Sequence, residues 1–465
     1  MITSPAFAGR HYAVLGLARS GRATVDALLA SGARVTAWDE KAEARSWTPS
    51  PLQGRGPGRG ERQSLPASQT SPLPTLSPEG ERAYAVADLL AVDLRGLDAI
   101  IVSPGVPLNR HPIAARAREA GVPIIGDIEL FALARPSLPP HKVVGITGTN
   151  GKSTTTALVH HILKTAGVPT TMGGNIGLPI LAQDPLTPNK IGVGVYVLEL
   201  SSYQIDLTQS LDCDVAVLLN ITPDHLDRYG SFEAYEASKL RLFEMQDWAA
   251  HLAVVTEPWP TRNEFMDRIP NANIAFGHGY VYSDRQALWP LLQGPHNAQN
   301  AACAIITCKE LGIDDNLVEQ GLSTYPGLPH RMERVREQSG VLFVNDSKAT
   351  NPTSTAPALA AYPAVHWILG GLAKSDDLDA CAPHFDHVRA AYTIGEAGPM
   401  FARLLDGKVP AVTEAGTLEV AVGAAARNAK AGETVLLSPA CASFDQFKDY
   451  EARGDAFRAL VGALA

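Results

Sequence analysis

Several features are scarce or missing in this chain of 465 residues. No apolar run reaches the ~18–20 residues of a membrane-spanning helix. The first residues show no basic segment followed by an apolar core, so neither a membrane span nor a signal peptide is expected. The five cysteines are scattered, odd in number and without CxxC spacing. We therefore expect reduced thiols in a cytoplasmic protein rather than disulfides or a zinc site.

Positive charge is also in short supply. Lys and Arg total 39 against 48 Asp and Glu, which gives a net charge of −9. This balance argues against a broad basic surface, so no nucleic-acid partner is expected. Hydrophobic residues make up 45% of the chain and charged residues 19%, so most of it is expected to fold into globular domains.

Short apolar runs alternate with helical patterns along the chain, which is typical of an α/β fold. The pattern restarts after the Pro-rich residues 135–140 and again after Gly327. We therefore predict three domains, at residues 1–135, 136–328 and 329–465. Helices are expected at 20–30, 113–120, 152–166 and from Asp127. The expected strands are 11–17, 33–38, 97–102, 122–125, 143–147, 193–199, 215–220, 341–344, 365–369, 391–394 and 434–438.

The first domain has two unusual segments. Residues 48–80 contain no aromatic residue, valine or isoleucine and are rich in Pro, Gly and Ser, so we predict a disordered insertion. The turn from Gly16 to Gly21 is not a GxGxxG, so an NAD site is not favoured. Two interpretations stay open: a plain βα turn, or an anion site at the helix start with Asp39 near a ribose.

The segment VGITGTNGKST, residues 144–154, carries the strongest chemical signal. A buried strand runs into a turn with Gly148 and Gly151, and a helix then begins at Lys152. Backbone amides of such a turn cradle polyphosphate, Lys152 would reach the β- and γ-phosphates, and the Ser153 hydroxyl would bind Mg²⁺. The strict GxxxxGK[ST] pattern fails by one position, because residue 146 is Ile. The segment predicts a protein that uses ATP or GTP.

Polar residues follow the next strands, where ligands bind in doubly wound sheets. Glu199 ends one strand, Asn220 and His225 follow another, and Lys239 lies on the helix after that. Glu199 and His225 suit Mg²⁺, whereas for Asp224 and Asp227 we favour helix capping and a solvated turn. A hydrolase is disfavoured because no GxSxG motif occurs, and a GTPase is disfavoured because no guanine motif of the AsnLysxAsp type occurs.

Longer motifs resemble a known family. TGTNGKST (147–154), GGNIG (173–177), LELSSYQ (198–204), NITPDHLDR (220–228), GPHNAQNAA (294–302) and HRME (330–333) are similar to those of the Mur ligases, which add amino acids during peptidoglycan synthesis. In the last third, VNDSKATN (344–351) and LSPACASFDQF (437–447) resemble the members that join D-glutamate to UDP-N-acetylmuramoyl-L-alanine. A polyglutamate-adding enzyme, a different Mur step and a non-catalytic binding protein are the alternatives.

The resemblance implies an α/β fold with a Rossmann-like UDP-binding domain, a central P-loop-type ATPase domain and a C-terminal Rossmann-like domain. It implies ATP and two Mg²⁺ ions as cofactors, UDP-N-acetylmuramoyl-L-alanine and D-glutamate as substrates, an acyl-phosphate intermediate and a cytoplasmic enzyme. We expect a monomer. Two departures from the family's pattern are a Tyr at position 450, where Phe is expected, and the loop 369–375, which lacks an acidic-Gly pair before Lys374.

The resemblance also assigns roles to individual residues. Catalytic roles fall to Lys152, His225, Lys239 and Lys348. ATP binding falls to Gly148, Thr149, Asn150, Gly151, Lys152, Ser153, Thr154, Asn297, Asn300, Arg331 and Asp346. Substrate binding falls to Ser20, Gly21, Asp39, Ser103, Gly105, Asn175, Thr350, Lys374, Ser443, Phe444 and Tyr450. The metal residues are Ser153, Glu199, His225 and Lys239, the last after carbamylation.

Overall fold

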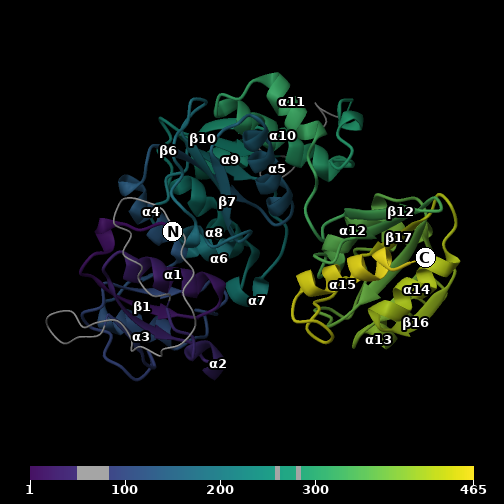
Figure 1. The fold of residues 1–465 in the computed structure, drawn as a ribbon, viewed down its shortest axis with the longest axis horizontal. Helices are drawn as coiled ribbons and strands as arrows, with labels where there is room; N and C mark the ends of the chain where they lie inside the picture. The colour runs from purple at the N-terminus through teal and green to yellow at the C-terminus, as the bar shows by residue number, and fades with distance from the viewer. Residues whose placement is uncertain (50–82, 257–261, 279–283, 465) are drawn as a thin grey trace, which may run out of the picture. The chain divides into compact units, whose positions relative to one another are not determined.

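The computed structural model describes residues 1–49, 83–256, 262–278 and 284–464. These residues divide into two compact units, one formed by Met1–Val281 with Gln299–Leu322 and the other by Tyr282–Ala298 with Ser323–Ala465 (Figure 1). Of the predicted insertion 48–80, residues 50–80 lie outside the described residues. Within the described ranges, no helix is both long and apolar enough to cross a membrane. All five cysteines are free and buried, as expected.

The first sheet of the first unit is parallel and has the order β3-β2-β1-β4-β5. Its core strands are apolar runs, as the sequence predicts for strands covered on both faces. The strands are β1 (His11–Leu15), β2 (Arg34–Trp38), β3 (Tyr84–Val86), β4 (Ala99–Val102) and β5 (Ile124–Ile125). The helices and turns around it are η1 (Pro5–Phe7), α1 (Arg19–Ala30), α2 (Ala42–Arg45), α3 (Ile113–Ala120), α4 (Asp127–Ala134) and η2 (Arg135–Ser137).

The second sheet of this unit is also parallel, with the order β11-β10-β9-β6-β8-β7. Its strands are β6 (His141–Thr147), β7 (Thr170–Gly174), β8 (Gly194–Glu199), β9 (Val215–Leu218), β10 (Leu252–Val255) and β11 (Asn273–Phe276). Its helices are α5 (Lys152–Thr165), η3 (Ile180–Ala182), α6 (Ser202–Asp206), α7 (Leu226–Tyr229), α8 (Phe232–Glu244), α9 (Arg262–Arg268), α10 (Pro295–Glu310) and α11 (Asp315–Ser323). β6 lies between β8 and β9, so the loop after β6 opens at a point where ligands bind in such sheets.

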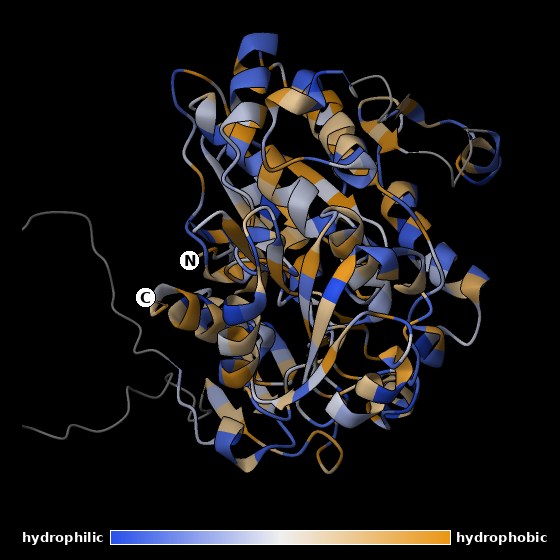
Figure 2. Cartoon of the chain, turned by 90° about the vertical axis from the view of Figure 1, so that its right-hand side faces the viewer, coloured by the Kyte–Doolittle hydropathy of each residue, from blue (hydrophilic) through white to orange (hydrophobic). Residues whose placement is uncertain are grey.

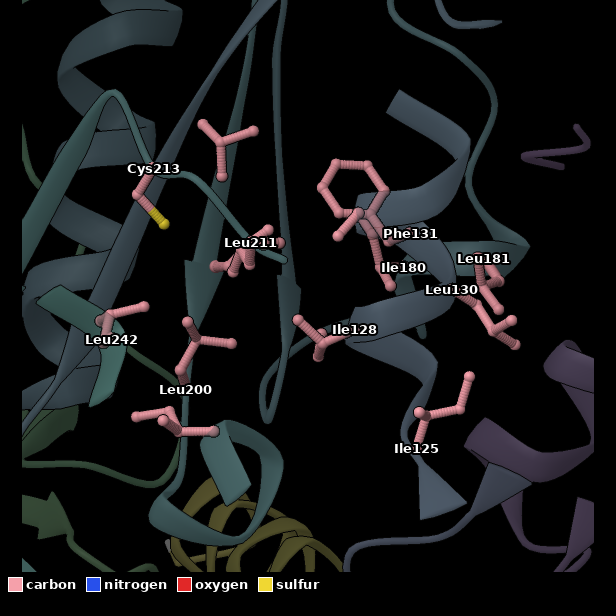
Figure 3. Packing of buried hydrophobic residues seen from close by; sticks show 14 of the residues in the cluster. Ile125, Ile128, Leu130, Phe131, Ile180, Leu181, Leu200, Leu211, Cys213 and Leu242 are labelled. Atoms are coloured by element: carbon pink, nitrogen blue, oxygen red, sulfur yellow. The ribbon is translucent and has the colours of Figure 1, made fainter. Parts of the chain in front are cut away.

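One hydrophobic core joins the two sheets of the first unit. Ile128 and Phe131 of α4 pack in the same buried cluster as Leu181, Leu200 and residues of the second sheet (Figure 3). The rings of Phe131 and Tyr196 meet edge to face, with centroids 5.0 Å apart. The shared core explains why both sheets fall in one compact unit, because the apolar residues of α4 are buried only by this packing.

The second unit holds a sheet of order β12-β13-β17-β14-β15-β16, in which β12 alone runs antiparallel to its neighbour among the described strands. Val365, Trp367 and Leu369 point to one buried cluster and Ile368 to the other, so helices cover both faces. Figure 2 shows much of the orange, hydrophobic colour on strands, while helices alternate orange and blue. The strands are β12 (Glu333–Gln338), β13 (Val341–Asn345), β14 (Val365–Gly370), β15 (Val388–Ile394), β16 (Val412–Gly416) and β17 (Thr434–Leu437). The helices and turns are η5 (Gln286–Leu288), α12 (Pro352–Ala360), η6 (Ala382–His387), α13 (Gly398–Leu405), α14 (Leu418–Asn428) and α15 (Tyr450–Gly462).

The predicted α/β class is confirmed, and each strand predicted from an apolar run forms, with shifts of a few residues at the ends. The prediction for 11–17 is too long at its end, because β1 stops at Leu15 where the first turn begins. The sequence interpretation missed β3, β7, β10, β11, β12 and β16. β12 is a charged strand at the edge of its sheet, and β7 contains two glycines, so neither shows the apolar run of a buried strand.

Candidate functional site

A phosphate-type loop leaves the C-terminal end of β6. Residues 148–151 connect β6 to α5, which begins at Lys152. Gly151 has φ 87°, and a Cβ there would lie 2.4 Å from Oδ1 of Asn300, so the turn requires glycine. Nζ of Lys152 donates hydrogen bonds to the carbonyl oxygens of Gly148 (2.9 Å) and Thr149 (2.8 Å). The loop therefore has the tight turn and the lysine that polyphosphate binding needs.

The segment after β9 braces this loop. The side chain of Asn220 accepts a hydrogen bond from the backbone N–H of Asn150 (2.8 Å) and donates one to the carbonyl oxygen of Asn150 (3.1 Å). Oγ1 of Thr149 accepts from the N–H of Thr222 (3.0 Å) and lies 3.1 Å from the hydroxyl of Tyr235. Asn220 and Thr149 thus fix the shape of the loop backbone.

Glu199 lies beside the loop at the end of β8. It pairs in register with Ile146, two residues before the loop, and is 2% exposed. Its Oε1 accepts a hydrogen bond of 2.9 Å from Nδ2 of Asn175, whose backbone N–H donates to the Glu199 carbonyl oxygen at 2.8 Å. The structure therefore brings together two residues that the sequence assigned to the metal and substrate.

Lys239 reaches the same loop from α8. It is 1% exposed, and its Nζ donates to the carbonyl oxygen of Gly148 (3.0 Å) and lies 4.6 Å from the ring centroid of Tyr235. Burial, and after it the positive charge of Lys152, lower the pKa of Lys239 well below its usual range. A neutral amine is the form that reacts with carbon dioxide, so this environment favours the carbamate that the sequence resemblance implies.

His225 begins α7 with φ 53°, a left-handed conformation that is uncommon for a residue with a side chain. Its ring centroid lies 4.9 Å from that of Tyr203 and 6.1 Å from that of Tyr235. Burial lowers the pKa of His225, the charges of Lys239 and Lys152 lower it further, and Asp224 opposes them. The imidazole is therefore neutral near pH 7, the form that binds a metal ion.

These residues fit a nucleotide with Mg²⁺. The first turn of α5, with Ser153 and Thr154, directs backbone amides toward the loop. Mg²⁺ commonly takes one or two protein ligands and completes its shell with water and substrate phosphates. Glu199 and His225 are suitable ligands. In the described part of the chain, no three His, Cys, Asp or Glu side chains gather to hold a metal, so phosphate oxygens and water have to complete the shell.

The first turn of the chain lies at the carboxyl end of β1. A Cβ on Gly21 would lie 1.8 Å from the carbonyl oxygen of Gly16, so α1 approaches this turn closely. Oγ of Ser103 donates a hydrogen bond of 3.1 Å to the same oxygen. Ser20 lies in the first turn of α1, and Gly105 is exposed in the loop after β4. The structure thus brings four predicted substrate residues to one end of the first sheet.

Asp39 belongs to the same end of that sheet. One carboxylate oxygen accepts a hydrogen bond from the N–H of Leu17 (2.6 Å) and the other from the N–H of Lys41 (2.9 Å). The carboxylate therefore already has a structural role in holding the first turn against the end of β2. Of the two interpretations open at the sequence level, the plain structural one is satisfied, and a contact with a ribose would be additional.

Helix α10 carries the two asparagines that the resemblance places near adenine. They are three residues apart and so share one face of the helix. Nδ2 of Asn297 donates to the carbonyl oxygen of Gln293 (3.1 Å). Asn300 is 4% exposed and lies against Gly151 of the phosphate loop, as the Cβ distance above shows. Asn300 is therefore placed beside the loop after β6 rather than in the open.

In the second unit, Asp346 ends a short buried network after β13. It accepts hydrogen bonds from the Ser438 hydroxyl (2.7 Å) and the N–H of Met332 (3.1 Å). Burial raises the pKa of Asp346 to about 7, against the effect of the Ser438 hydrogen bond and the Arg331 charge. Nε of Arg331 is buried and has no hydrogen-bond partner among the described residues. Nζ of Lys348 lies 5.7 Å from the ring centroid of Tyr450.

Residues assigned to the amino acid also lie in this unit. Nζ of Lys374 donates to Oγ1 of Thr350 at 3.3 Å, so these two predicted residues meet. Ser443 is 2% exposed, whereas the neighbouring Phe444 is 70% exposed. Phe444 is the most exposed of the large hydrophobic side chains described. Tyr450 begins α15.

The sequence interpretation missed Arg453, which lies three residues after Tyr450. It is 1% exposed, and its guanidinium donates to the carbonyl oxygens of Ser347 (2.9 Å), Cys441 (3.0 Å) and Ala442 (3.2 Å). Burial lowers the pKa of Arg453 to about 10. Ser347 precedes Lys348, and Ala442 precedes Ser443, so Arg453 ties together loops that carry predicted site residues. An arginine in a helix gives no sign of this in the sequence.

Comparisons with known proteins agree with one another. Residues 146–308 match the Mur ligase middle domain, and residues 330–441 match the Mur ligase glutamate ligase domain. Two proteins named UDP-N-acetylmuramoylalanine--D-glutamate ligase are similar throughout. That of Novosphingobium aromaticivorans is 57% identical over 466 residues, covering 100% of this chain and 97% of that protein. That of Zymomonas mobilis is 54% identical over 469 residues, covering 100% of both.

Solved structures are similar at the level of the fold. The UDP-N-acetylmuramate-alanine ligase of Thermotoga maritima gives a TM-score of 0.55 at 16% identity, covering 98% of this chain and 99% of that one. At this identity the similarity concerns the arrangement of helices and strands. It agrees with the α/β architecture described above.

Proposed function

This chain belongs to the Mur ligase family, and we propose that the loop after β6, Glu199, His225 and Lys239 form its active centre. The chain is an ATP-dependent, ADP-forming amide ligase of peptidoglycan synthesis that adds D-glutamate to UDP-N-acetylmuramoyl-L-alanine. The observation that carries the site proposal is the convergence of Lys152 and Lys239 on one carbonyl oxygen, that of Gly148.

The reaction needs an activated carboxylate. The L-alanyl carboxylate attacks the γ-phosphorus of ATP, the bond to the β,γ-bridging oxygen breaks, and ADP leaves, so that an acyl phosphate forms. The amine of D-glutamate then attacks the acyl carbon, an amide bond forms, phosphate leaves and the amine loses a proton. Negative charge shifts between oxygens in both steps, so fixed cationic groups at those oxygens lower the barrier.

In the first unit, we assign charge stabilisation to Lys152 and phosphate binding to residues 148–154. Asn300 would contact the nucleotide from its place beside Gly151. Glu199 and His225 would hold Mg²⁺, which supplies a Lewis acid for the phosphate oxygens. Lys239, once carbamylated, would add two oxygen ligands, for which its lowered pKa is the support.

In the second unit, we assign Arg331 and Asp346 to ATP and Lys348 to catalysis. Lys374, Thr350, Ser443 and Phe444 would hold D-glutamate, with Lys374 pairing a carboxylate. The Lys374–Thr350 hydrogen bond supports this assignment, because it places an ammonium and a hydroxyl together at the end of the sheet.

Further properties belong to the same proposal. We keep the division at 1–135, 136–328 and 329–465 as three functional domains, since each contains one of the three sheets. Ser20, Gly21, Asp39, Ser103 and Gly105 would bind the UDP part of the substrate, with Asn175 near the sugar and the metal. The enzyme would act as a monomer in the cytoplasm, with two Mg²⁺ ions for each ATP.

The test is phosphate release from ATP and Mg²⁺ with UDP-N-acetylmuramoyl-L-alanine, comparing D-glutamate, L-glutamate and no amino acid. Release that depends on D-glutamate is the expected result. Release with L-glutamate alone would overturn the assigned amino acid and leave the ATP site in place. The variant Lys152→Ala is expected to release none, with Lys190→Ala, an exposed lysine of the same unit, as its control.

A further inference from the structure

His225 is the N-cap residue of helix α7, which is only one turn long. Short isolated helices are unstable in water, so the place of this turn depends on side-chain contacts. At its end, the hydroxyl of Tyr229 donates to Oδ2 of Asp206 (2.7 Å) and lies 3.2 Å from Oγ of Ser238. These contacts hold the turn to α6 and α8, but they do not touch the imidazole of His225.

Arg228 makes a second set of contacts, one of which reaches the aromatic ring beside His225. Its guanidinium carbon lies 3.9 Å from the ring centroid of Tyr203, which is close enough for a cation–π contact. The ring of Tyr203 in turn packs on the ring of His225, with centroids 4.9 Å apart. Tyr203 belongs to α6, which begins three residues after Glu199 in the chain.

The same guanidinium reaches the first sheet. Nη1 of Arg228 donates a hydrogen bond of 3.2 Å to the carbonyl oxygen of Pro104, in the loop after β4. That loop also contains Ser103 and Gly105, the residues assigned to the sugar nucleotide. From the other side, Asn109 donates to the carbonyl oxygen of Arg228 at 3.2 Å. The turn that carries His225 is therefore connected to the loop that would bind the substrate.

We propose that Arg228 is a positioning residue that fixes His225 relative to the loop of Ser103, Pro104 and Gly105, so that the bound sugar nucleotide strengthens metal binding at His225. The proposal rests on the function proposed above. When substrate orders this loop, the Pro104 carbonyl and the guanidinium gain a fixed geometry, and the ring of Tyr203 holds the imidazole in place. By linkage, the metal must strengthen substrate binding by the same factor.

The test measures binding and does not require turnover. Mn²⁺ replaces Mg²⁺ and is titrated by its paramagnetic resonance signal against the full chain, with a saturating non-hydrolysable ATP analogue and no D-glutamate. Each titration is made without and with UDP-N-acetylmuramoyl-L-alanine. For the unaltered chain, the substrate should raise the affinity for Mn²⁺ by about 5-fold or more, which is the lower end of typical coupling between sites.

Arg228→Met keeps the length of the side chain but removes the cation and the donor. We expect its Mn²⁺ affinity to change less than about 2-fold on adding substrate, a loss of most of the coupling. Arg228→Lys keeps a cation but has a single nitrogen for the ring of Tyr203 and the carbonyl oxygen of Pro104. Its coupling should therefore lie between that of the unaltered chain and that of Arg228→Met. Arg95→Gln, which removes an exposed arginine paired with Asp93, is the matched control and should keep full coupling.

Three results would overturn the proposal. The first is full coupling in Arg228→Met, and the second is no coupling in the unaltered chain. The third is a loss of affinity for the ATP analogue in Arg228→Met that is as large as its loss of affinity for Mn²⁺, because that would indicate general damage to the unit. Failure of the proposed function itself would appear elsewhere, as an unaltered chain that releases no phosphate with D-glutamate.

Discussion

Replacing Lys239 by methionine should separate stability from activity. The ammonium is 1% exposed, forms a hydrogen bond to the Gly148 carbonyl oxygen and lies near the charge of Lys152. A buried cation without a carboxylate partner destabilises a fold, whereas an apolar side chain of similar length suits the space. We therefore expect Lys239→Met to unfold at the same temperature as the unaltered chain or at a higher one.

Its activity should fall steeply. At the usual lysine pKa of about 10.4, roughly one amine in a thousand is neutral at pH 7.5, and each unit by which the pKa falls raises that fraction about tenfold. The lowered pKa thus prepares Lys239 for reaction with carbon dioxide. Loss of the resulting oxygen ligands should reduce turnover by about a thousandfold, or about 4 kcal/mol of transition-state stabilisation.

The assay is phosphate release, with the variant Lys239→Ala added. In that variant the space left by the side chain should admit a small carboxylate such as formate or acetate, which can supply the missing oxygens. Activity should then recover with increasing carboxylate, while propanol of similar size should have no effect. Near-normal turnover in Lys239→Met, or no recovery in Lys239→Ala, would make Lys239 an ordinary structural lysine.

Three further predictions concern single residues. Lys152→Ala should lose phosphate release and keep its thermal unfolding, because the ammonium donates to the carbonyl oxygens of a loop rather than to a buried core; near-normal turnover would contradict its role. Gly151→Ala should weaken ADP binding, measured by calorimetry, tenfold or more. A side chain at positive φ costs about 1–2 kcal/mol, and it would also displace Asn300. Gly192→Ala is the control and should bind ADP normally, because there is open space around its Cβ. Burial raises the pKa of Asp127 to about 6, so its ionisation destabilises the fold as the pH rises from about 4 to 6. As the pH rises across that range, the free energy of unfolding of Asp127→Asn, measured in urea, should increase by up to about 3 kcal/mol relative to that of the unaltered chain. A difference that does not depend on pH would refute this.

Much of the first unit could be predicted because its central strands are buried on both faces. Such strands appear as continuous apolar runs, so β1, β6 and β8 are visible in the sequence. The rule that ligands meet at the carboxyl ends of parallel strands then placed Lys152 and Glu199 near each other, although they lie far apart in the chain. The sequence placed Lys239 on the helix after these strands, but its role came only from the family resemblance, because a lysine on a helix has no periodic signature of burial.

Contacts between loops were beyond the reach of sequence patterns. The role of Asn220 depends on the side chain meeting Asn150 across two loops, and that of Arg228 depends on the approach of α7 to the loop after β4. Neither contact follows from helical or strand periodicity. The contact of Arg228 depends on how the two sheets of the first unit pack on their shared core, whereas that of Asn220 depends on the pairing of β6 with β9 within one sheet.

Arg453 shows the same point in the second unit. The loops after β13 and β17 carry buried carbonyl groups outside the regular strands, of which that of Ala442 also accepts a hydrogen bond from the N–H of Leu372 (2.9 Å). Buried carbonyl groups without a partner destabilise a fold. A guanidinium has five donors in one plane, and Arg453 uses them to satisfy the carbonyl groups of Ser347, Cys441 and Ala442. Its pKa of about 10 keeps it charged at neutral pH in spite of burial. The loops that carry Lys348 and Ser443 therefore owe part of their shape to Arg453, and substitutions of Arg453 should alter the geometry of the proposed amino-acid site.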